Sequence, residues 1–380
     1  MRARAPNRYD RLEWAGAFGD LGTLLPFVIA YIGVLKMDAS GVLLAFGASM
    51  IVCGWWYRTP LPVQPMKAIG AAATTQAAQT AVLTPGAVHA AGLVTGLVWL
   101  LLGGTGFVRW LARRIGRPVT QGIVLGLALA FMLQGAGLMA KDWWLAAPAL
   151  LLVLLLARQQ RVPAIFVLMT LGLAWSAVTQ PEAWQALVQV RPQWHWPQWV
   201  WPTLGWQELV LGTVFLALPQ LPLTLGNAIV GVQQEHNRLF PDRPVSERQL
   251  SLSTGAMNLL GSAIGGVPMC HGAGGLAGHV AFGARSGGAL VILGLLLTLL
   301  ALVFAHAVLG LFALIPQAVL GTILFMAGMQ LAGGQFDQAR TANDSTVLLL
   351  TAGLSMWNVA IGFVLGLALH AWLSRRGQGR

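Results

Sequence analysis

Apolar runs of about the length that crosses a lipid bilayer recur along this chain of 380 residues. A helix needs roughly 20 mostly apolar residues to span the hydrocarbon core. Residues 90–107, 120–140, 143–157 and 287–312 form runs near that length. Only 9% of the residues are charged, whereas soluble domains carry about 25%. The sequence therefore predicts an all-α polytopic membrane protein.

Hydropathy and turn residues predict about 14 transmembrane segments. They lie near residues 14–35, 41–57, 63–82, 88–108, 119–140, 143–157, 162–179, 206–232, 248–264, 267–283, 287–310, 312–333, 345–356 and 358–374.

The basic residues indicate an orientation in the membrane rather than a nucleic-acid partner. The formal net charge is +11, and most of the 23 Lys and Arg residues fall on one side if the N-terminus is cytoplasmic. We therefore predict an integral protein of a bacterial-type inner or plasma membrane, in contact with the lipid bilayer, with both termini in the cytoplasm.

Two stretches of the chain are similar to each other. PVQPMKAIGAAA at residues 62–73 and GVPMCHGAGGLA at 266–277 both place Pro-Met ahead of small residues, and Pro65 and Pro268 are 203 positions apart. DLGTLL and QLPLTL begin at Asp20 and Gln220, 200 positions apart. Seven segments per half would make the second half enter from the opposite side. We predict two inverted repeats, residues 1–180 and 206–380, and an external Trp- and Pro-rich linker at 181–205.

The Pro-Met pairs predict short extended breaks within the third and tenth segments. A half-helix begins well after a proline, and its first amides form an anion site when small residues leave them uncovered. The two half-helix N-termini would then face each other near the bilayer centre. The small residues are Ala68, Gly70, Ala71, Gly272, Ala273, Gly274 and Gly275. Close helix packing is the alternative explanation for them.

Polar side chains gather at the same two places, where Gln64, Lys67, Cys270 and His271 occur. Lys67 supplies a counter-charge or lies at the edge of an aqueous path. His271 donates a hydrogen bond to an anion, titrates during transport, or is structural. Asp20 carries a coupling proton, pairs with Lys67, or caps a helix at the break in GDLGTLLP.

The sequence predicts no cofactor and no metal site. Cys270 and His271 are adjacent, but a second Cys/His pair at ligand spacing is absent from the sequence. A Walker A motif and a nucleophile elbow are also absent, so we expect neither an enzyme nor ATP hydrolysis within this chain.

Three motifs resemble the molybdate transporter family related to the sulfate permeases: GAFGDLGTLLPF (16–27), PVQPMKAIGAA (62–72) and GGVPMCHGAGGLAGH followed by FGARSG. The resemblance covers the whole membrane chain, without the soluble C-terminal domain that sulfate permeases usually carry. It implies a core domain that carries substrate and a gate domain that supports it, each drawn from both repeats. It also implies molybdate uptake by an elevator-like movement and a possible homodimer formed through the gate. The binding residues it implies are Asp20, Thr23, Gln64, Pro65, Met66, Lys67, Ala68, Gln220, Asn227, Cys270, His271, Gly272, Ala273, Gly274 and Gly275.

We therefore predict a secondary active transporter that takes up a tetrahedral oxyanion together with a coupling proton or cation. Molybdate is the expected substrate, and sulfate and tungstate are the alternative substrates. A proton-coupled nucleobase permease of the same architecture and a passive anion channel are the alternatives.

Overall fold

The computed structural model describes residues 6–74, 84–114, 116–156, 164–200, 204–333 and 341–377. Its first half contains α1 (Arg11–Ala17), η1 (Phe18–Asp20), α2 (Leu21–Ile29), η2 (Ala30–Val34), α3 (Ala39–Tyr57), β1 (Gln64–Pro65), α4 (Lys67–Thr74), α5 (Pro85–Thr105), α6 (Val108–Arg114), α7 (Arg117–Ala140), α8 (Trp143–Leu156), α9 (Ala164–Thr179) and α10 (Pro181–Val188).

The second half continues the helical pattern. It contains α11 (Trp206–Leu211), η5 (Gly212–Ala217), α12 (Leu218–Leu223), η6 (Thr224–Gly231), α13 (Val232–Leu239), α14 (Glu247–Ala263), β2 (Met269–Cys270), α15 (Ala273–Ala281), α16 (Gly288–Val303), η7 (Ala305–Ala307), α17 (Val308–Ala313), α18 (Gln317–Ala332), α19 (Ala342–Trp357) and α20 (Val359–Gly377).

Helix starts follow the capping residues of the sequence. The side chains of Asp38, Thr84, Ser246 and Thr341 each accept a hydrogen bond from a backbone amide in the first turn of α3, α5, α14 and α19. A break at Asn358 separates α19 from α20, so the last two predicted segments form separate helices. The third predicted segment begins as β1 and α4, and its residues 75–82 lie outside the described residues.

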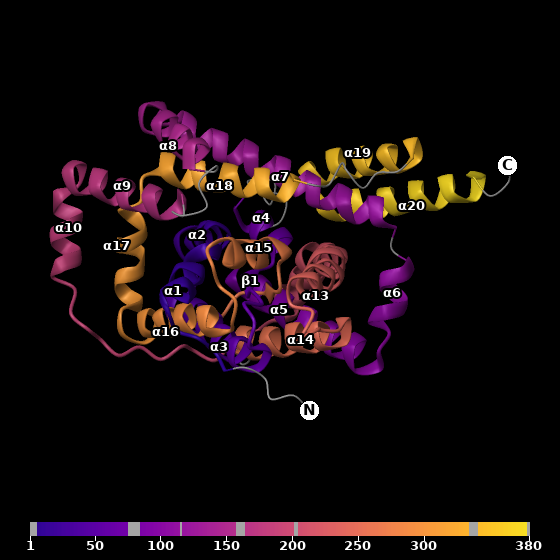
Figure 1. Cartoon of the computed structure of the whole chain (residues 1–380), viewed down its shortest axis with the longest axis horizontal. Coiled ribbons are helices and arrows are strands. Elements are labelled where there is room, and N and C mark those ends of the chain that lie inside the picture. Colours follow the sequence, from indigo (N-terminus) through magenta and orange to yellow (C-terminus); the bar gives the residue numbers. More distant parts are fainter. Residues whose placement is uncertain are drawn as a thin grey trace.

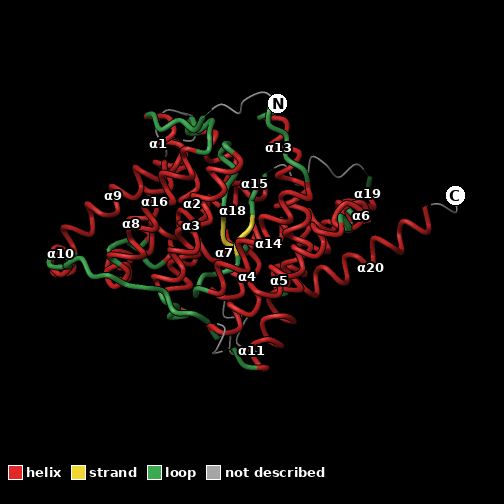
Figure 2. The backbone as a smooth tube through the Cα atoms, turned by 90° about the horizontal axis from the view of Figure 1, so that it is seen from below, coloured by secondary structure: helices red, strands yellow, loops and turns green. Residues whose placement is uncertain are grey.

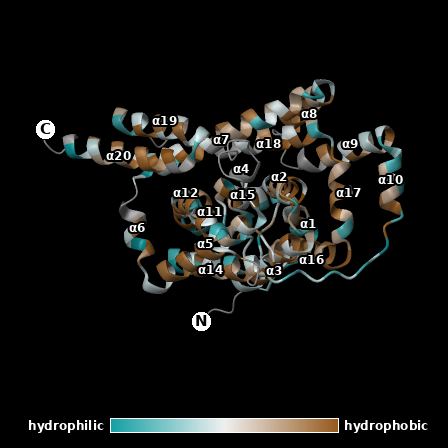
Figure 3. Cartoon of the chain, turned by 180° about the vertical axis from the view of Figure 1, so that it is seen from behind, coloured by the Kyte–Doolittle hydropathy of each residue, from teal (hydrophilic) through white to brown (hydrophobic). Residues whose placement is uncertain are grey.

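The helices form two layers (Figures 1 and 3). One layer contains α7, α8, α18, α19 and α20, which pack on one another. The other contains the pairs α3 with α16 and α5 with α14. Between them lie α2, α4, α15 and the two short strands. The site described below is therefore enclosed between the layers.

Glycines let helices of the two halves approach closely. A methyl group at Gly294 of α16 would lie 2.7 Å from Gly47 O of α3, and one at Gly255 of α14 would lie 2.9 Å from Gly96 O of α5. The same holds where α7 crosses α18, since a methyl group at Gly321 would lie 2.7 Å from Gly135 O. Small residues at helix crossings are typical of membrane proteins, which gain stability from close packing rather than from the hydrophobic effect.

Four of the described helices are long and apolar enough to cross a membrane: Ala39–Tyr57, Pro85–Thr105, Arg117–Ala140 and Trp206–Leu239. The number is six if two bent pairs count as single spans. One is Arg11–Asp20 with Thr23–Val34, bent by 49°, and the other is Gly288–Val303 with Ala305–Ala313, bent by 92°. Other predicted segments correspond to shorter apolar helices, including α8 and α18. Large exposed apolar side chains such as Trp55, Leu101 and Leu151 suit a lipid-facing surface.

The predicted linker contains helix α10 and an irregular segment, residues 189–200, before the undescribed residues 201–203. The amides of Gln193 and His195 donate to Val303 O and Leu302 O at the end of α16, over 3.0 and 2.8 Å. The Val200 amide donates to Ala263 O at the end of α14 over 3.0 Å. The segment thus satisfies carbonyls at the ends of two helices.

Candidate functional site

Two short extended segments meet at the centre of the structure (Figure 2). β1 and β2 pair antiparallel, with Gln64 opposite Cys270 and Pro65 opposite Met269. The amide of Met66 continues the pairing by donating to Pro268 O over 2.8 Å. All four strand residues are buried, so the pairing satisfies backbone groups that neither lipid nor water reaches.

A side chain from α14 fixes the position of β2. Asn258 donates from Nδ2 to Met269 O over 2.6 Å and accepts from Met269 N at Oδ1 over 2.8 Å. Asn258 is itself fully buried. Each strand is followed directly by a short helix, α4 or α15, so the pairing sets where both helices begin.

The start of α4 carries a buried cation. Lys67 is only 5% exposed. The ion pairs among the described residues are Arg8–Asp10, Arg109–Glu247 and Arg238–Glu235, and Lys67 takes part in none of them. The Ala68 amide donates to Gln220 Oε1 over 2.8 Å, and Gln220 Nε2 donates to Thr224 Oγ1 over 2.9 Å. Contrary to expectation, the Ala68 amide is therefore occupied by a side-chain acceptor.

The start of α15 is open. Gly272 is the N-cap residue, and no side chain caps the helix there. A methyl group at Gly274 would meet a single atom within 4 Å, Lys67 Nζ at 3.8 Å. A helix start presents unpaired amides and partial positive charge. The lysine of α4 and the first turn of α15 therefore lie next to each other.

A compact polar cluster joins the first helix to β1. Gln64 Nε2 donates to Thr23 Oγ1 over 2.6 Å and also to Asp20 Oδ1, which in addition accepts from the Thr23 hydroxyl. Asp20 does not cap α2 with its side chain, so the capping alternative is not what the structure shows. It lies within electrostatic range of Lys67 without forming an ion pair.

Glycine is required where this cluster meets α15. A methyl group at Gly275 would lie 2.5 Å from Gln64 Nε2 and 2.7 Å from Asp20 Oδ2, distances that side-chain carbons do not adopt. A methyl group at Gly272 would collide with Gln64 Oε1. The glycines of the tenth predicted segment thus admit polar side chains from the first and third.

Both ring nitrogens of His271 bind the scaffold. Nδ1 is 2.8 Å from Pro62 O and Nε2 is 2.7 Å from Ser253 Oγ, and the ring packs edge-on against Tyr57. The ring is fully buried. In this conformation both ring nitrogens are engaged by the protein, so a contact of His271 with an anion stays a prediction and would need a different conformation.

The remaining predicted residues vary in their placement. Pro65, Met66 and Cys270 are buried around the strand pair, with Cys270 a free thiol. Asn227 lies in η6, a π-helical segment that follows Gln220 and Thr224, and its side chain is half-buried. The structure describes no bond of the Asn227 side chain, so its role stays a prediction. Within the described ranges, no group of three or more His, Cys, Asp or Glu side chains is arranged for a metal ion.

Two residues at this site were not nominated from the sequence. Tyr31 of η2 is fully buried, its hydroxyl has no hydrogen-bond partner among the described residues, and it lies within electrostatic range of Cys270. His279 of α15 is also fully buried and lies within electrostatic range of Asp20. Their involvement depends on helix packing, which hydropathy does not report.

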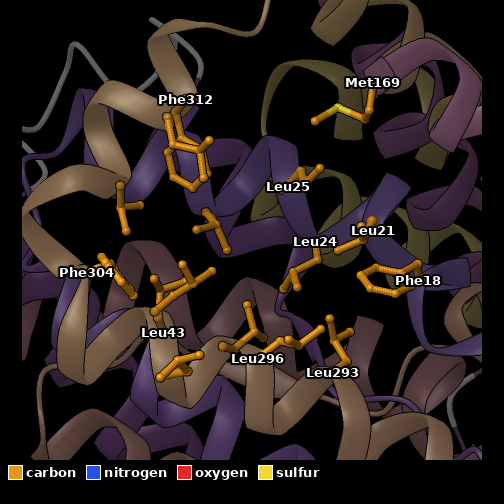
Figure 4. A pocket seen from close by; sticks show the side chains of 16 residues that line it. Phe18, Leu21, Leu24, Leu25, Leu43, Met169, Leu293, Leu296, Phe304 and Phe312 are labelled. Carbon is orange, nitrogen blue, oxygen red and sulfur yellow. The ribbon is translucent and has the colours of Figure 1, made fainter. Parts of the chain in front are cut away.

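A separate cavity of about 340 Å³ lies between α2, α3, α16, α17 and α9 (Figure 4). Its lining is apolar, with residues such as Leu24, Leu43, Met169, Leu296 and Phe312. Such a lining offers no donor to an anion. The polar site is therefore distinct from it.

Comparisons with known proteins agree on one family. A sequence profile described as "Molybdate transporter of MFS superfamily" matches residues 12–131 and 212–331, two stretches that begin 200 positions apart. "Molybdate transporter 2" of Arabidopsis thaliana is 31% identical over 96% of this chain and 87% of its own length. "Molybdate transporter 1" of Chlamydomonas reinhardtii is 26% identical over 96% of this chain and 92% of its own length.

Solved structures share the fold at low sequence identity. Murine Solute Carrier 26 family member A9, an anion transporter in the inward-facing state, superposes with a TM-score of 0.70 at 12% identity, covering 99% of this chain and 70% of that one. The transmembrane domain of the cyanobacterial bicarbonate transporter BicA gives a TM-score of 0.58 at 16% identity, covering 97% and 99%. A further structure, of SLC26A9, superposes with a TM-score of 0.66 at 13% identity, covering 96% of this chain and 65% of that one.

Proposed function

Because this chain belongs to the molybdate transporter family, we propose that it is a secondary active transporter that imports a tetrahedral oxyanion, most readily molybdate. The members it resembles are transporters, and the chain is an integral membrane transporter rather than an enzyme. The anion is held between the starts of α4 and α15 and crosses the membrane by alternating access.

The observation that carries this proposal is the buried Lys67, which forms no ion pair among the described residues and lies beside the first turn of α15. A buried cation without a partner is costly, and a bound anion removes that cost. The first amides of α15 supply hydrogen bonds and partial positive charge to the same oxyanion. Gly274 leaves the space between them free of side-chain atoms other than the lysine.

The other binding residues surround this centre. Gln64 and Thr23 orient the polar cluster, and Gln220 holds the start of α4 through the Ala68 amide. Asp20 is the coupling residue. His271 has a structural role in this conformation, and its second candidate role, coupling, would need a different conformation. The proposed anion-site residues are Thr23, Gln64, Pro65, Met66, Lys67, Ala68, Gln220, Asn227, Cys270, His271, Gly272, Ala273, Gly274 and Gly275.

The proposed architecture is a pair of inverted seven-segment repeats, residues 1–180 and 206–380. The 200-residue spacing of the two profile matches supports the duplication. The strand-and-helix pairs β1–α4 and β2–α15 support interrupted third and tenth spans. The layer containing α7, α8, α18, α19 and α20 is the gate, and the remainder is a core that moves as an elevator. Both termini are cytoplasmic in the inner or plasma membrane, and two copies pair through the gate.

Two other classes of protein on the same architecture are less well supported. A nucleobase permease needs a carboxylate on the eighth or tenth segment to hold ring N–H groups, and Gln220 with His271 fits that need poorly. A passive anion channel needs a continuous path, whereas Lys67 and the strand residues are buried. Sulfate and tungstate remain competing substrates because they share shape and charge with molybdate.

Uptake by purified protein in liposomes tests the proposal. We expect saturable accumulation of labelled molybdate that tungstate and sulfate compete with and uracil does not. Uptake no greater than into protein-free liposomes contradicts the transporter, competition by uracil favours the nucleobase permease, and flux without saturation favours the channel.

A further inference from the structure

Three buried acceptor atoms at the candidate site lack a hydrogen bond among the described residues: Asp20 Oδ2, Gln64 Oε1 and His279 Nε2. Asp20 is 2% exposed, and Gln64 and His279 are fully buried. An unsatisfied buried polar atom costs about 1–3 kcal/mol. The unsatisfied acceptors of Asp20 and His279, which lie within electrostatic range of each other, suit a group that can donate hydrogen bonds.

The hydrogen bond made by Nδ1 fixes the chemistry of the His279 ring. Nδ1 is 2.7 Å from Gly16 O. A carbonyl oxygen only accepts, so Nδ1 carries the proton, and Nε2 of the neutral ring presents a lone pair. Asp20 Oδ1 already accepts from Thr23 and Gln64, so Oδ2 presents a lone pair as well. The two residues therefore offer two acceptors and no hydrogen between them.

The packing of α15 against the first helix brings Asp20 and His279 into electrostatic range of each other, although the two side chains form no ion pair in this conformation. His279 contacts Gly16, and the Gly275 position contacts Asp20, so the two segments run antiparallel. Between those contacts, a methyl group at Gly278 would lie 2.6 Å from Gly19 O. Helical side chains lean toward the helix N-terminus, so the His279 ring leans toward Gly275 and hence toward Asp20.

We propose that Asp20 and His279 form a proton-binding site, in which a bound proton draws the two side chains together and is shared between Asp20 Oδ2 and His279 Nε2. This inference rests on the transporter function proposed above and specifies its coupling ion. The proton comes from water on the side where the anion binds, lets the two acceptors approach and form one N–H···O bond, and returns to water where the anion leaves.

The groups around the pair favour a proton over a metal cation. Asp20 also faces Lys67 from α4 and the Cys270 thiol from β2. Hard cations such as Na⁺ prefer oxygen ligands, and the imidazole nitrogen is a poor one for them. Glu13, the neighbouring buried carboxylate of α1, is already bound by the amides of Arg285, Ser286 and Ala289.

Anion and proton would bind together for an electrostatic reason. A dianion beside Lys67 offsets the positive charge that otherwise disfavours protonation of the nearby pair. Coupling is reciprocal, so the bound proton strengthens anion binding by the same factor. Calorimetry of molybdate binding in buffers of different ionisation enthalpy should therefore show net uptake of about one proton per anion.

Transport by two variants tests the site directly. His279→Asn keeps an amide donor at the position of Nδ1 for Gly16 O but has no ring nitrogen that can accept a proton, and Asp20→Asn removes the carboxylate. His89→Gln is the matched control, because buried His89 of α5 uses Nε2 on Gly265 O, 3.2 Å away and outside the site. Each variant is checked by a thermal melt, and its accumulation under an acid-outside gradient is divided by its own exchange rate without a gradient.

We expect that ratio to lose its dependence on the proton gradient in both site variants and to keep it in the control. Gradient-driven accumulation by folded His279→Asn overturns the site. So does accumulation driven by Na⁺, or the absence of proton uptake when the unmodified protein binds molybdate. If the unmodified protein exchanges no molybdate at all, the transporter proposal fails first, which separates the two failures.

Discussion

The start of α4 carries a charge and a cap, whereas the start of α15 carries neither. At α4, Lys67 is buried and Gln220 occupies the Ala68 amide. At α15, glycines leave the first turn open, and the polar groups beside it come from other segments. The two starts thus share a strand followed by a helix, and in the proposed site α4 supplies charge whereas α15 supplies backbone amides.

The largest expected effect comes from removing the charge at α4. Lys67→Met keeps an unbranched chain of similar length but loses the ammonium group. Because a hydrogen bond to a charged group contributes about 1.5–3 kcal/mol, we expect molybdate affinity to fall by up to about 100-fold. Calorimetry measures the dissociation constant for molybdate, and Lys141→Met, at an exposed position, is the control. An unchanged dissociation constant would place the anion elsewhere.

Replacing His271, which precedes α15, should lower the stability of the protein and leave its anion affinity unchanged. His271→Phe keeps the ring but leaves Pro62 O and Ser253 Oγ without their partner. We expect a loss of about 2 kcal/mol in the free energy of unfolding, because buried groups are orphaned. A thermal melt and a binding titration on the folded fraction separate the two effects. A variant that is normally stable but binds molybdate more weakly would show that His271 contacts the anion.

The smallest effect comes from adding one methyl group to the open start. Gly274→Ala meets only the end of Lys67 within 4 Å, so the fold has room for it. The methyl group does cover the amides, and we expect affinity to fall about tenfold, as for one lost hydrogen bond to a charged group. Gly137→Ala of α7, which meets nothing within 4 Å, is the control. If both variants bind molybdate with equal affinity, the start of α15 does not contact the anion.

Much of this arrangement follows from local sequence, because Pro-Met followed by small residues encodes a break and a new helix at each half. The spacing of Asp20 and Gln220 agrees with the spacing of the two profile matches. The bond from Ala68 to Gln220 and the bond from His271 to Pro62 were beyond prediction, since each joins residues more than 150 positions apart.

His279 shows why composition is not enough. Its neighbours in the sequence suggest a packed histidine, and only the antiparallel contact of α15 with the first helix aligns it with Asp20. The tautomer, and hence the lone pair, depends on the carbonyl of Gly16, a group that the sequence does not distinguish from any other carbonyl.

The backbone bonds of the segment after α10 connect that helix to the end of α16. Val190 is still tied to α10 by its bond to Leu187 O, and Gln193 is already tied to the end of α16. The stretch between them reaches at most about 10 Å when fully extended. If α16 moves away from α10 in the proposed transport cycle, a displacement beyond that length requires the bonds at the end of α16 to break, so this segment would limit the movement.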